Sequence, residues 1–310
     1  APVVQRLGDT EGSGFMITAV TGPGGFVGRA LVKALIERAE RPVLLSRNVA
    51  RLPDFGGAVE PVEWSSTAAT HLPRIDAVVN LAGETISGRW TPEKKRAIRD
   101  SRVLGTRRLV EAISRLEPKP RVLVSASAVG YYGDRGEEEL AEDSGPGTGF
   151  LPGVCVEWES EVSKAAEPGI RVVMLRIAVV LDSGGGALQQ MITPFKAGLG
   201  GPMGSGRQWF PWIHRTDLVN MILAAIDNDW SGPVNAASPG VVRQAEFAKA
   251  LGSALGRPAV MPAPGFALRL MLGEFADTLL HSQKVIPAKA QTEGFKFRYP
   301  TLREAPAASV

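Results

Sequence analysis

The chain of 310 residues contains a single cysteine, Cys155, so no disulfide can form within it. This favours a reducing compartment, and we expect a cytoplasmic protein. Only three histidines occur, His71, His214 and His281, and their wide spacing matches no metal-binding motif. No apolar run reaches the roughly 18 residues that a membrane span requires. We therefore expect neither a metal site nor a membrane span.

An excess of charge of one sign is also missing. The 35 Lys and Arg residues face 32 Asp and Glu residues, which gives a net charge of +3 spread along the chain. A nucleic-acid partner is therefore not expected. The hydrophobic content of 44% and the charged content of 22% are typical of a globular protein, and the length suits one large domain, alone or with a smaller lobe.

Residues 1–15 are polar and contain glycine, and they lack the charged-then-apolar layout of a secretory signal. We expect the folded domain to begin at Met16, with residues 1–15 as an N-terminal extension. A native extension, a cloning remnant and the end of a processed leader would all look like this. A processed leader would make the plastid stroma the alternative compartment.

Apolar segments alternate with helical segments through the first two thirds of the chain. This pattern predicts an α/β fold, with a Rossmann-type doubly wound parallel sheet and a smaller C-terminal substrate lobe. Strands are expected at Ile17–Val20, Pro42–Leu45, Val59–Trp64, Ala77–Asn80, Arg121–Ser125, Val172–Arg176 and Val234–Ala237. Helices are expected at Gly28–Ala39, Pro92–Leu116, Val154–Ala165 and Leu218–Ile226. Pro61 would suit only a short or edge strand, and Thr91 followed by Pro92 is typical of a helix start.

From Ser183 to Trp212 the alternation gives way to a stretch rich in glycine, proline and aromatic residues. We therefore assign residues 16–182 to a dinucleotide-binding domain, to which residues 218–240 return. Residues 183–217 and 241–310 form the predicted substrate lobe, which includes a C-terminal module.

The first apolar strand ends in a turn with Gly22, Gly25 and Gly28, and an amphipathic helix follows. This arrangement seats a dinucleotide pyrophosphate on a helix N-terminus. Gly22 permits the tight turn, Gly25 lets backbone N–H groups approach phosphate, and Gly28 lets the helix pack against the strand. A structural turn alone is the simpler alternative.

The end of the second strand discriminates between dinucleotides. An acidic residue there would bind a ribose 2′-hydroxyl and repel a 2′-phosphate. The chain has Ser46, Arg47 and Asn48 instead, and a guanidinium forms a charge-assisted fork with phosphate. NADP(H) is therefore favoured over NAD(H), unless Arg47 is simply a solvated loop residue.

Three motifs together resemble the extended short-chain dehydrogenases/reductases: Thr21–Gly28, Val79–Glu84 and Val124–Gly133. Within that superfamily the chain resembles an atypical, epimerase-like branch, the epimerase family proteins that have also been labelled cell-division-inhibitor-like. The motifs of that branch are Ser87–Thr91, Val154–Glu159, Gly200–Trp209, Trp212–His214 and Leu272–Pro287. The resemblance covers about Met16 to Leu302.

The resemblance and the glycine turn together imply a set of cofactor-binding residues around the carboxyl ends of the strands. They are Thr21, Gly22, Gly24, Gly25, Phe26, Val27, Gly28, Ser46, Arg47, Asn48, Leu81, Ala82, Gly83, Glu84, Ser125 and Arg176. By the logic of the family, Ser127 is the hydroxyl that polarises the substrate.

The catalytic tyrosine and lysine of that superfamily, which are four residues apart, are absent. Alignment on Trp158 and Glu159 puts Leu151 in place of the tyrosine and Cys155 in place of the lysine. A leucine carries no proton, and a neutral thiol cannot replace an ammonium. Candidate proton donors are Tyr131 and Tyr132, although an aromatic pair here is equally explained by packing or by a substrate wall. Cys155 itself is more typical of a small buried residue than of a nucleophile.

Other polar residues near these motifs have open roles. Glu157 and Glu159, two residues apart on a helix, point to different faces, so one of them is expected to be solvated. His214 and Asp217 are expected to cap the following helix, with a pocket wall as the alternative role of His214.

Planar apolar side chains with a few fixed charges predict a pocket for a flat or hydroxylated ligand, although core packing explains the tryptophans equally well. The candidate substrate-binding residues are Arg89, Trp90, Gln208, Trp209, Trp212 and His214. Two functions remain open. One is an NADP(H)-dependent oxidoreductase or epimerase acting on an unidentified small carbonyl or sugar-like substrate. The other is a catalytically reduced NADP(H)-binding redox sensor or scaffold with a protein partner, such as division or assembly machinery.

Overall fold

The computed structural model describes residues 16–64, 72–303 and 305. The predicted N-terminal extension, His71 and the last residues of the predicted C-terminal module lie outside the described residues.

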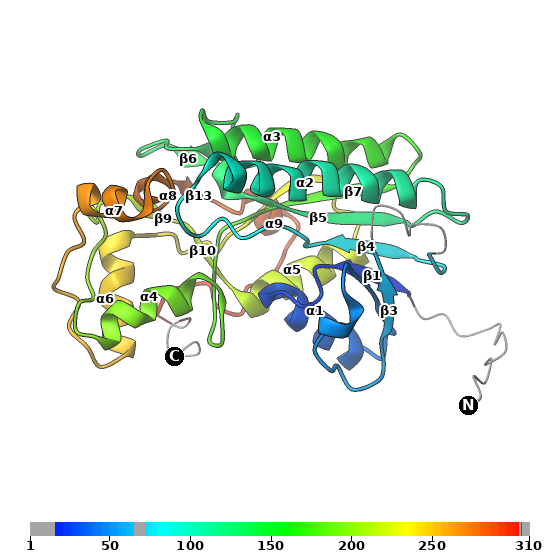
Figure 1. Cartoon of the computed structure of the whole chain (residues 1–310), viewed down its shortest axis with the longest axis horizontal. Coiled ribbons are helices and arrows are strands. Elements are labelled where there is room, and N and C mark those ends of the chain that lie inside the picture. Colours follow the sequence, from blue (N-terminus) through cyan, green and yellow to red (C-terminus); the bar gives the residue numbers. More distant parts are fainter. Residues whose placement is uncertain (1–15, 65–71, 304, 306–310) are drawn as a thin grey trace.

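The centre of the protein is a seven-stranded sheet in which every pair of neighbours is parallel (Figure 1). In spatial order the strands are β11 (Gly232–Ala236), β7 (Arg171–Ile177), β5 (Val122–Ala128), β4 (Ala77–Asn80), β1 (Thr18–Thr21), β2 (Val43–Ser46) and β3 (Glu60–Glu63). The strand order reverses direction between β1 and β4, which is the switch point where ligands of such sheets bind. The predicted doubly wound parallel sheet is thus confirmed, and Pro61 lies on β3, at an edge of the sheet.

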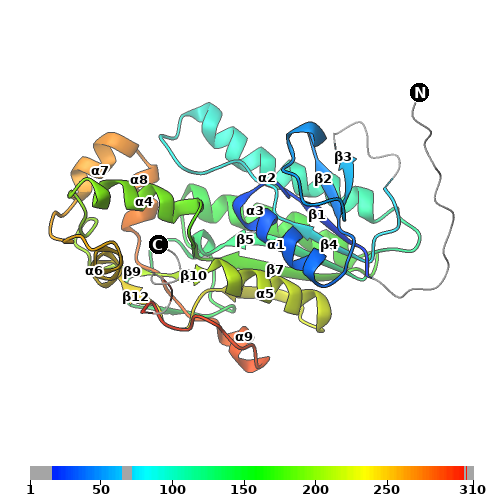
Figure 2. The same ribbon diagram turned by 90° about the horizontal axis from the view of Figure 1, so that it is seen from below.

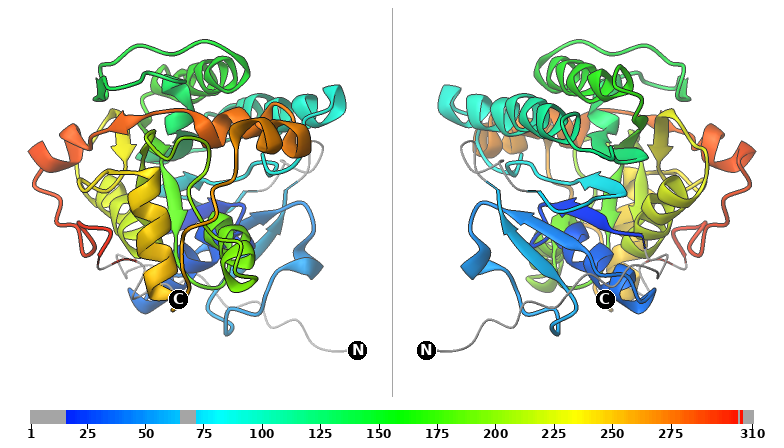
Figure 3. Two further views of the ribbon diagram at one scale, coloured as in Figure 1. Left: turned by 90° about the vertical axis from the view of Figure 1, so that its left-hand side faces the viewer. Right: turned by 90° about the vertical axis from the view of Figure 1, so that its right-hand side faces the viewer.

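Helices cover both faces of the sheet (Figures 1 and 3). One face carries α1 (Phe26–Glu37) and α5 (Arg215–Asp227), whose apolar residues form one buried cluster with the strands. The other face carries α2 (Pro92–Ile113) and α3 (Phe150–Ser163), which form a second cluster. Burial of these faces is the main source of stability, because it removes apolar surface from water.

The start of α2 is the one that the sequence predicts. Thr91 Oγ1 accepts a hydrogen bond from the backbone N–H of Lys94 at 3.2 Å, and Pro92 occupies the first turn. Helix α3 begins at Phe150, earlier than the expected Val154, because Pro152 fits a first turn that needs no backbone donor there. This places Leu151 inside α3.

A third apolar cluster lies at one end of the sheet, where segments from the last part of the chain pack together (Figure 2). It includes α4 (Gly186–Lys196), in a stretch where the sequence analysis expects no helix. Buried Leu188, Ile192 and Phe195 recur at helical spacing, and this amphipathic pattern outweighs the glycines around it and Pro194 within it.

The remaining elements are short. The strands are β6 (Glu139–Leu140), β8 (Val179–Leu181), β9 (Trp209–Phe210), β10 (Trp212–His214), β12 (Val242–Arg243) and β13 (Lys284–Val285). The helices are η1 (Val49–Arg51), η2 (Val129–Tyr132), η3 (Lys164–Ala166), α6 (Gln244–Ala254), α7 (Gly265–Leu272), α8 (Phe275–Leu280) and α9 (Ala288–Thr292).

Gly28 lets α1 pack directly on the turn that precedes it. A Cβ atom at this position would lie 2.2 Å from the carbonyl oxygen of Gly22, far inside van der Waals contact. Gly153 in α3 differs, since a Cβ atom there would meet nothing within 4 Å. Comparing substitutions at these two glycines therefore distinguishes the effect of close packing from the general effect of glycine on helix stability.

We expect Gly28→Ala to lower the free energy of unfolding by about 2 kcal/mol or more, because the helix must move away from the strand. The control, Gly153→Ala, should raise it by about 0.5–1 kcal/mol, since alanine favours the helix. Urea unfolding of both variants measures this. Equal stability of Gly28→Ala and the wild type would contradict the packing role of Gly28.

Candidate functional site

The turn between β1 and α1 leaves a helix N-terminus open. Gly22 has a φ of +67°, and a Cβ atom there would lie 2.9 Å from the carbonyl oxygen of Leu81. Gly25 is the N-cap residue of α1, and no side chain of the described residues caps this helix. The first turn of α1 also lacks acidic residues. The unpaired N–H groups and the positive end of the helix dipole therefore suit an anion.

Buried hydrogen bonds join this turn to the loop after β4. Thr21 Oγ1 donates to Asn80 Oδ1 at 2.7 Å and accepts from the backbone N–H groups of Leu81 and Ala82, each at 3.1 Å. Asn80 Nδ2 in turn donates to Ser125 Oγ at 3.1 Å. Thr21 and Ser125, two predicted cofactor residues, are buried, so their side chains position the backbone of the loops.

A cleft of about 1490 Å³ opens above this network at the switch point of the sheet. The predicted cofactor residues that line it are Thr21, Gly22, Gly24, Gly25, Ser46, Arg47, Asn48, Leu81, Ala82, Gly83 and Glu84. Of the other predicted residues, Phe26, Val27 and Gly28 belong to the first turn of α1. Ser125 and Arg176 are buried and do not line the cleft.

Charges of both signs line the cleft, with arginines in the majority. They are Arg47, Arg51, Arg108 and Arg115, against Glu84, Asp100 and Glu111. The pKa of Glu84 is lowered mainly by its hydrogen bond from Lys94 Nζ, at 2.8 Å, with smaller effects of nearby positive charges. The cleft thus combines an open helix N-terminus with cations, which suits a ligand that carries several phosphates.

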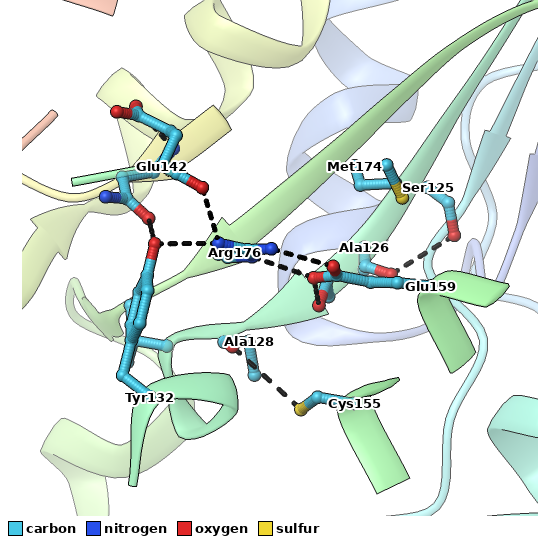
Figure 4. Close-up of polar contacts among 12 residues, drawn as sticks. Ser125, Ala126, Ala128, Tyr132, Glu142, Cys155, Glu159, Met174 and Arg176 are labelled. Carbon is cyan, nitrogen blue, oxygen red and sulfur yellow. Dashed lines mark hydrogen bonds and ion pairs between the residues drawn. The ribbon is translucent and has the colours of Figure 1, made fainter. Parts of the chain in front are cut away.

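Between β5, β7 and α3 lies a buried ion pair (Figure 4). Arg176 on β7 is 3% exposed and donates from Nε and Nη2 to the two carboxylate oxygens of Glu159 on α3, each at 2.9 Å. Its Nη1 also donates to Tyr132 Oη and to the carbonyl oxygen of Glu142, both at 3.0 Å. The Arg176 guanidinium is thus used within the protein, which argues against its predicted contact with a cofactor.

Glu159 also binds a candidate catalytic residue. Ser127 Oγ donates to Glu159 Oε1 at 2.6 Å. A hydroxyl whose proton is directed at a carboxylate does not polarise a carbonyl; only its lone pairs remain for a ligand. Glu157, two residues earlier, is exposed and pairs with Arg99, so the two carboxylates do point to different faces.

The two candidate tyrosines differ in accessibility. Tyr132 is fully buried, and its hydroxyl bonds to Asn235 Oδ1 at 2.7 Å as well as to Arg176. Burial raises the pKa of Tyr132 to about 12 despite the nearby guanidinium. These observations argue against Tyr132 as a proton donor, because its proton is inaccessible and held by a buried acceptor.

Tyr131 is only partly buried, and its hydroxyl has no hydrogen-bond partner among the described residues. The guanidinium of Arg176 lies over its ring, 3.6 Å from the centroid. Leu151 lies close by, since a Cβ atom at Gly130 would be 3.6 Å from the Leu151 side chain. Leu151, which stands where the superfamily has its tyrosine, therefore lies near the backbone that precedes Tyr131.

Cys155, in the place of the expected lysine, is buried, and its Sγ lies 3.9 Å from the carbonyl oxygen of Ala128. Burial raises the pKa of this thiol to about 12. A protonated, buried thiol does not act as a nucleophile, in agreement with the simpler interpretation of its role.

Three of the predicted substrate residues are buried. Trp212 is 0% exposed and donates from Nε1 to the carbonyl oxygen of Gly240, and Gln208 bonds to the carbonyl oxygens of Met203 and Leu279. His214 is the N-cap of α5, where its Nδ1 accepts from the backbone N–H of Thr216 at 3.1 Å. Packing and hydrogen bonds thus account for Trp212 and Gln208, whereas His214 Nε2 is buried and has no hydrogen-bond partner among the described residues.

Asp217 does not cap α5, contrary to the prediction. Its carboxylate accepts hydrogen bonds from the backbone N–H groups of Arg298 and Tyr299, at 2.7 and 2.9 Å. The C-terminal segment packs against α5, and its backbone N–H groups bind the Asp217 carboxylate in place of the N–H groups at the start of the helix.

The remaining predicted substrate residues reach the surface. Arg89 is exposed, and Trp90 is partly buried between the rings of Phe150 and Phe275. Trp209 donates from Nε1 to Glu137, and the guanidinium of Arg243 lies 3.8 Å from its ring centroid.

Two further features of the site escape the sequence analysis. Asn235 and Glu142 complete the hydrogen bonds around Tyr132 and Arg176, and no local pattern indicates them. Arg102 on α2 also belongs to the site region, and here a signal exists, because it falls on the buried stripe of an amphipathic helix.

In the part of the chain that the structure describes, no group of three or more His, Cys, Asp or Glu residues could hold a metal ion. No helix in the same part is long and apolar enough to cross a membrane.

Comparisons with known proteins agree with this geometry. A model of the NAD dependent epimerase/dehydratase family matches residues 18–237, and a domain of unknown function, DUF1731, matches residues 263–308. The Arabidopsis thaliana epimerase family protein SDR39U1 homolog, chloroplastic, is 43% identical over 301 residues, which cover 94% of this chain and 85% of that protein.

Two solved structures are similar along the chain. The crystal structure of human epimerase family protein SDR39U1 (isoform 2) with NADPH has a TM-score of 0.86 and 37% identity, and the match covers 94% of this chain and 98% of the human one. A nucleoside-diphosphate sugar epimerase from Corynebacterium glutamicum has a TM-score of 0.77 and 34% identity, over 95% of this chain and 58% of its own. The chain therefore belongs to the NAD-dependent epimerase/dehydratase family of extended short-chain dehydrogenases/reductases, among the SDR39U1-like epimerase family proteins.

Proposed function

We propose that this protein binds NADP(H) in the cleft at the switch point and transfers hydride between it and a small carbonyl or sugar-like substrate. The observation that carries the proposal is the cleft itself, in which an uncapped helix N-terminus and several arginines line one continuous space of about 1490 Å³. This volume exceeds the ~300–1,000 Å³ typical of small-ligand pockets, so an extended dinucleotide fits. The NADPH in the human relative and the sugar-nucleotide name of the bacterial one support the proposal.

Different residues of the cleft would bind different parts of NADP(H). The first turn of α1 would hold the pyrophosphate, and Ser46, Arg47 and Asn48 would hold the adenosine end with its 2′-phosphate. Ser46 Oγ accepts from the backbone N–H of Asn48 at 3.3 Å, which fixes the turn that carries Arg47. When bound, NADP(H) supplies or accepts the hydride.

Reduction of a carbonyl adds a hydride to carbon and a proton to oxygen, and the chain must provide the proton. Tyr131 is the best donor, because its hydroxyl is unpaired among the described residues and its ring is held by Arg176. Its partial exposure lets solvent restore the proton after each turnover. Ser127, held by Glu159, would accept a hydrogen bond from a hydroxyl of the substrate or product, rather than polarise the carbonyl.

Arg47→Glu tests the cofactor assignment. We expect it to raise the Kd of NADPH by about 10-fold or more and to narrow the preference over NADH, because a carboxylate repels the 2′-phosphate. Equilibrium titration with both nucleotides measures this. Arg41→Glu makes the same charge change at an exposed residue that does not line the cleft and should leave both values unchanged. An unaltered preference in Arg47→Glu would reject the role of Arg47.

Tyr131→Phe tests the proton donor. With a substrate found by screening aldehydes, ketones and nucleotide sugars for NADPH oxidation or epimerised product, we expect kcat to fall by about 100-fold or more. The Kd of NADPH should not change. Tyr299→Phe removes the same oxygen from a tyrosine that lies beside His214, and it serves as the control.

Retention of full activity in Tyr131→Phe would reject Tyr131 as the donor. If the wild type binds NADPH but converts no member of the panel, and NADPH instead alters its affinity for a protein partner, the proposed hydride transfer is wrong. The alternative function, a redox sensor or scaffold with a partner, then takes its place.

A further inference from the structure

Arg102 occupies an unusual place on α2. The buried residues of this helix include Ile98, Thr106, Leu109 and Ile113, and Arg102 lies four residues from both Ile98 and Thr106, on the same stripe. A charged residue on a stripe that faces the protein interior needs partners for its donors. The partners of Arg102 therefore indicate what it is for.

Arg102 binds uncharged groups, and not all of its N–H donors have a partner among the described residues. Its Nη1 donates to the carbonyl oxygens of Glu84 and Ile98, both at 3.0 Å, and its guanidinium lies 5.3 Å from the ring centroid of Trp158. A Cβ atom at Gly83 would lie 3.3 Å from Arg102 Cζ, so the glycine lets the guanidinium lie against the loop after β4. Within residues 16–64 and 72–303, no carboxylate forms an ion pair with Arg102, and its Nε and Nη2 have no hydrogen-bond partner.

This guanidinium lies near the part of α3 where the superfamily has its lysine. Trp158 follows Cys155 by three residues on α3, so both side chains lie on the same side of that helix, toward Arg102. The positive charge of Arg102 accordingly opposes the rise in the pKa of the Cys155 thiol that burial causes. Arg102 thus brings a cation from α2 to the region where the superfamily has a lysine on α3.

We propose that Arg102 replaces that lysine in binding, with its free N–H groups donating to the hydroxyl oxygens of the ribose on the nicotinamide side of NADP(H). This inference rests on the proposed binding of NADP(H). The loop after β4, against which Arg102 lies, lines the cleft through Gly83 and Glu84, and Arg102 lies on the side of that loop that faces α3. Because a guanidinium does not release its proton near neutral pH, Arg102 binds without transferring a proton, and proton transfer is left to Tyr131.

The test compares two ligands. NADPH contains the nicotinamide-side ribose, whereas adenosine 2′,5′-bisphosphate contains only the adenosine end with its 2′-phosphate. We expect Arg102→Gln to raise the Kd of NADPH by about 10-fold or more, since at least one charge-assisted hydrogen bond is lost. The Kd of adenosine 2′,5′-bisphosphate and the urea midpoint of the ligand-free protein should stay close to wild type. Arg96→Gln, an identical change at an exposed position of α2, should alter none of these values.

A second variant keeps the test usable if Arg102→Gln does not fold. Arg102→Lys keeps the charge with a shorter reach, and it should weaken NADPH binding selectively but less than Arg102→Gln does. Unchanged NADPH binding, or equal weakening of both ligands, would overturn the role of Arg102 and leave it as a support for the loop after β4. A wild-type protein that binds neither ligand would overturn the proposed function as well, so the two failures are distinguishable.

Discussion

The ion pair between Arg176 and Glu159 fixes the polar groups at the carboxyl ends of β5 and β7. Each charge loses several kcal/mol of hydration when it is buried, and a single contact would not offset that loss. Here both carboxylate oxygens accept from Arg176, Ser127 adds a third donor, and the remaining guanidinium group reaches Tyr132 and Glu142. With its hydrogen bonds satisfied, the pair positions neighbouring side chains more than it stabilises the fold. It sets the direction of the Ser127 hydroxyl, and it holds the ring of Tyr131 from one face.

Because Leu151 and Cys155 stand where the superfamily has its tyrosine and lysine, the site cannot work as the usual arrangement of a tyrosine with a lysine four residues later would. In that arrangement one helix carries both the proton donor and the cation that binds the ribose. In this chain the same helix carries Leu151 and Cys155, and the candidate groups come from η2 and from α2 instead. In the proposed site the proton donor, Tyr131, and the binding cation, Arg102, are separate residues on separate elements. Such a division is possible because the ends of neighbouring strands and helices converge at the switch point.

The fold was predictable where a periodic pattern carries the information. The apolar strands, the capped start of α2 at Thr91 and the edge position of Pro61 follow from local chemistry. Helix α4 was missed because its glycines and Pro194 obscure an amphipathic pattern of only three buried residues. The turn around Gly22, Gly25 and Gly28 was equally clear, since few other residues fit its backbone.

The pairing of polar residues was not predictable. Arg176 was assigned to the cofactor because it lies at the carboxyl end of an expected strand, but its partner depends on how β7 lies beside α3. Asp217 was expected to cap its own helix, and donors from residues 298 and 299 claimed it instead. For Asp217 a long-range contact replaces the local one, because a buried donor without an acceptor costs more than an exposed helix end. Arg102 shows the reverse: a charged residue on an apolar stripe is visible in the sequence, and only the structure shows that, among the described residues, it forms no ion pair and is near just one carboxylate, that of Glu84.

The cofactor cleft and the proposed reaction site are therefore built from different parts of the chain. The cleft is built from backbone, with Gly22 in a left-handed conformation and α1 uncapped, and such features bind phosphate whatever reaction follows. The proposed reaction site is built from side chains, and most of their hydrogen-bond donors bind one another. The hydroxyl of Tyr131 and the Nε and Nη2 groups of Arg102 have no partner among the described residues. A protein that only sensed NADP(H) would need the first set of features, whereas a protein that transfers hydride to a carbonyl also needs a proton donor, for which the hydroxyl of Tyr131 is the candidate. The geometric argument for a ligand that reaches beyond the adenosine end is Arg102, whose hydrogen bonds among the described residues go only to the backbone carbonyl oxygens of Glu84 and Ile98.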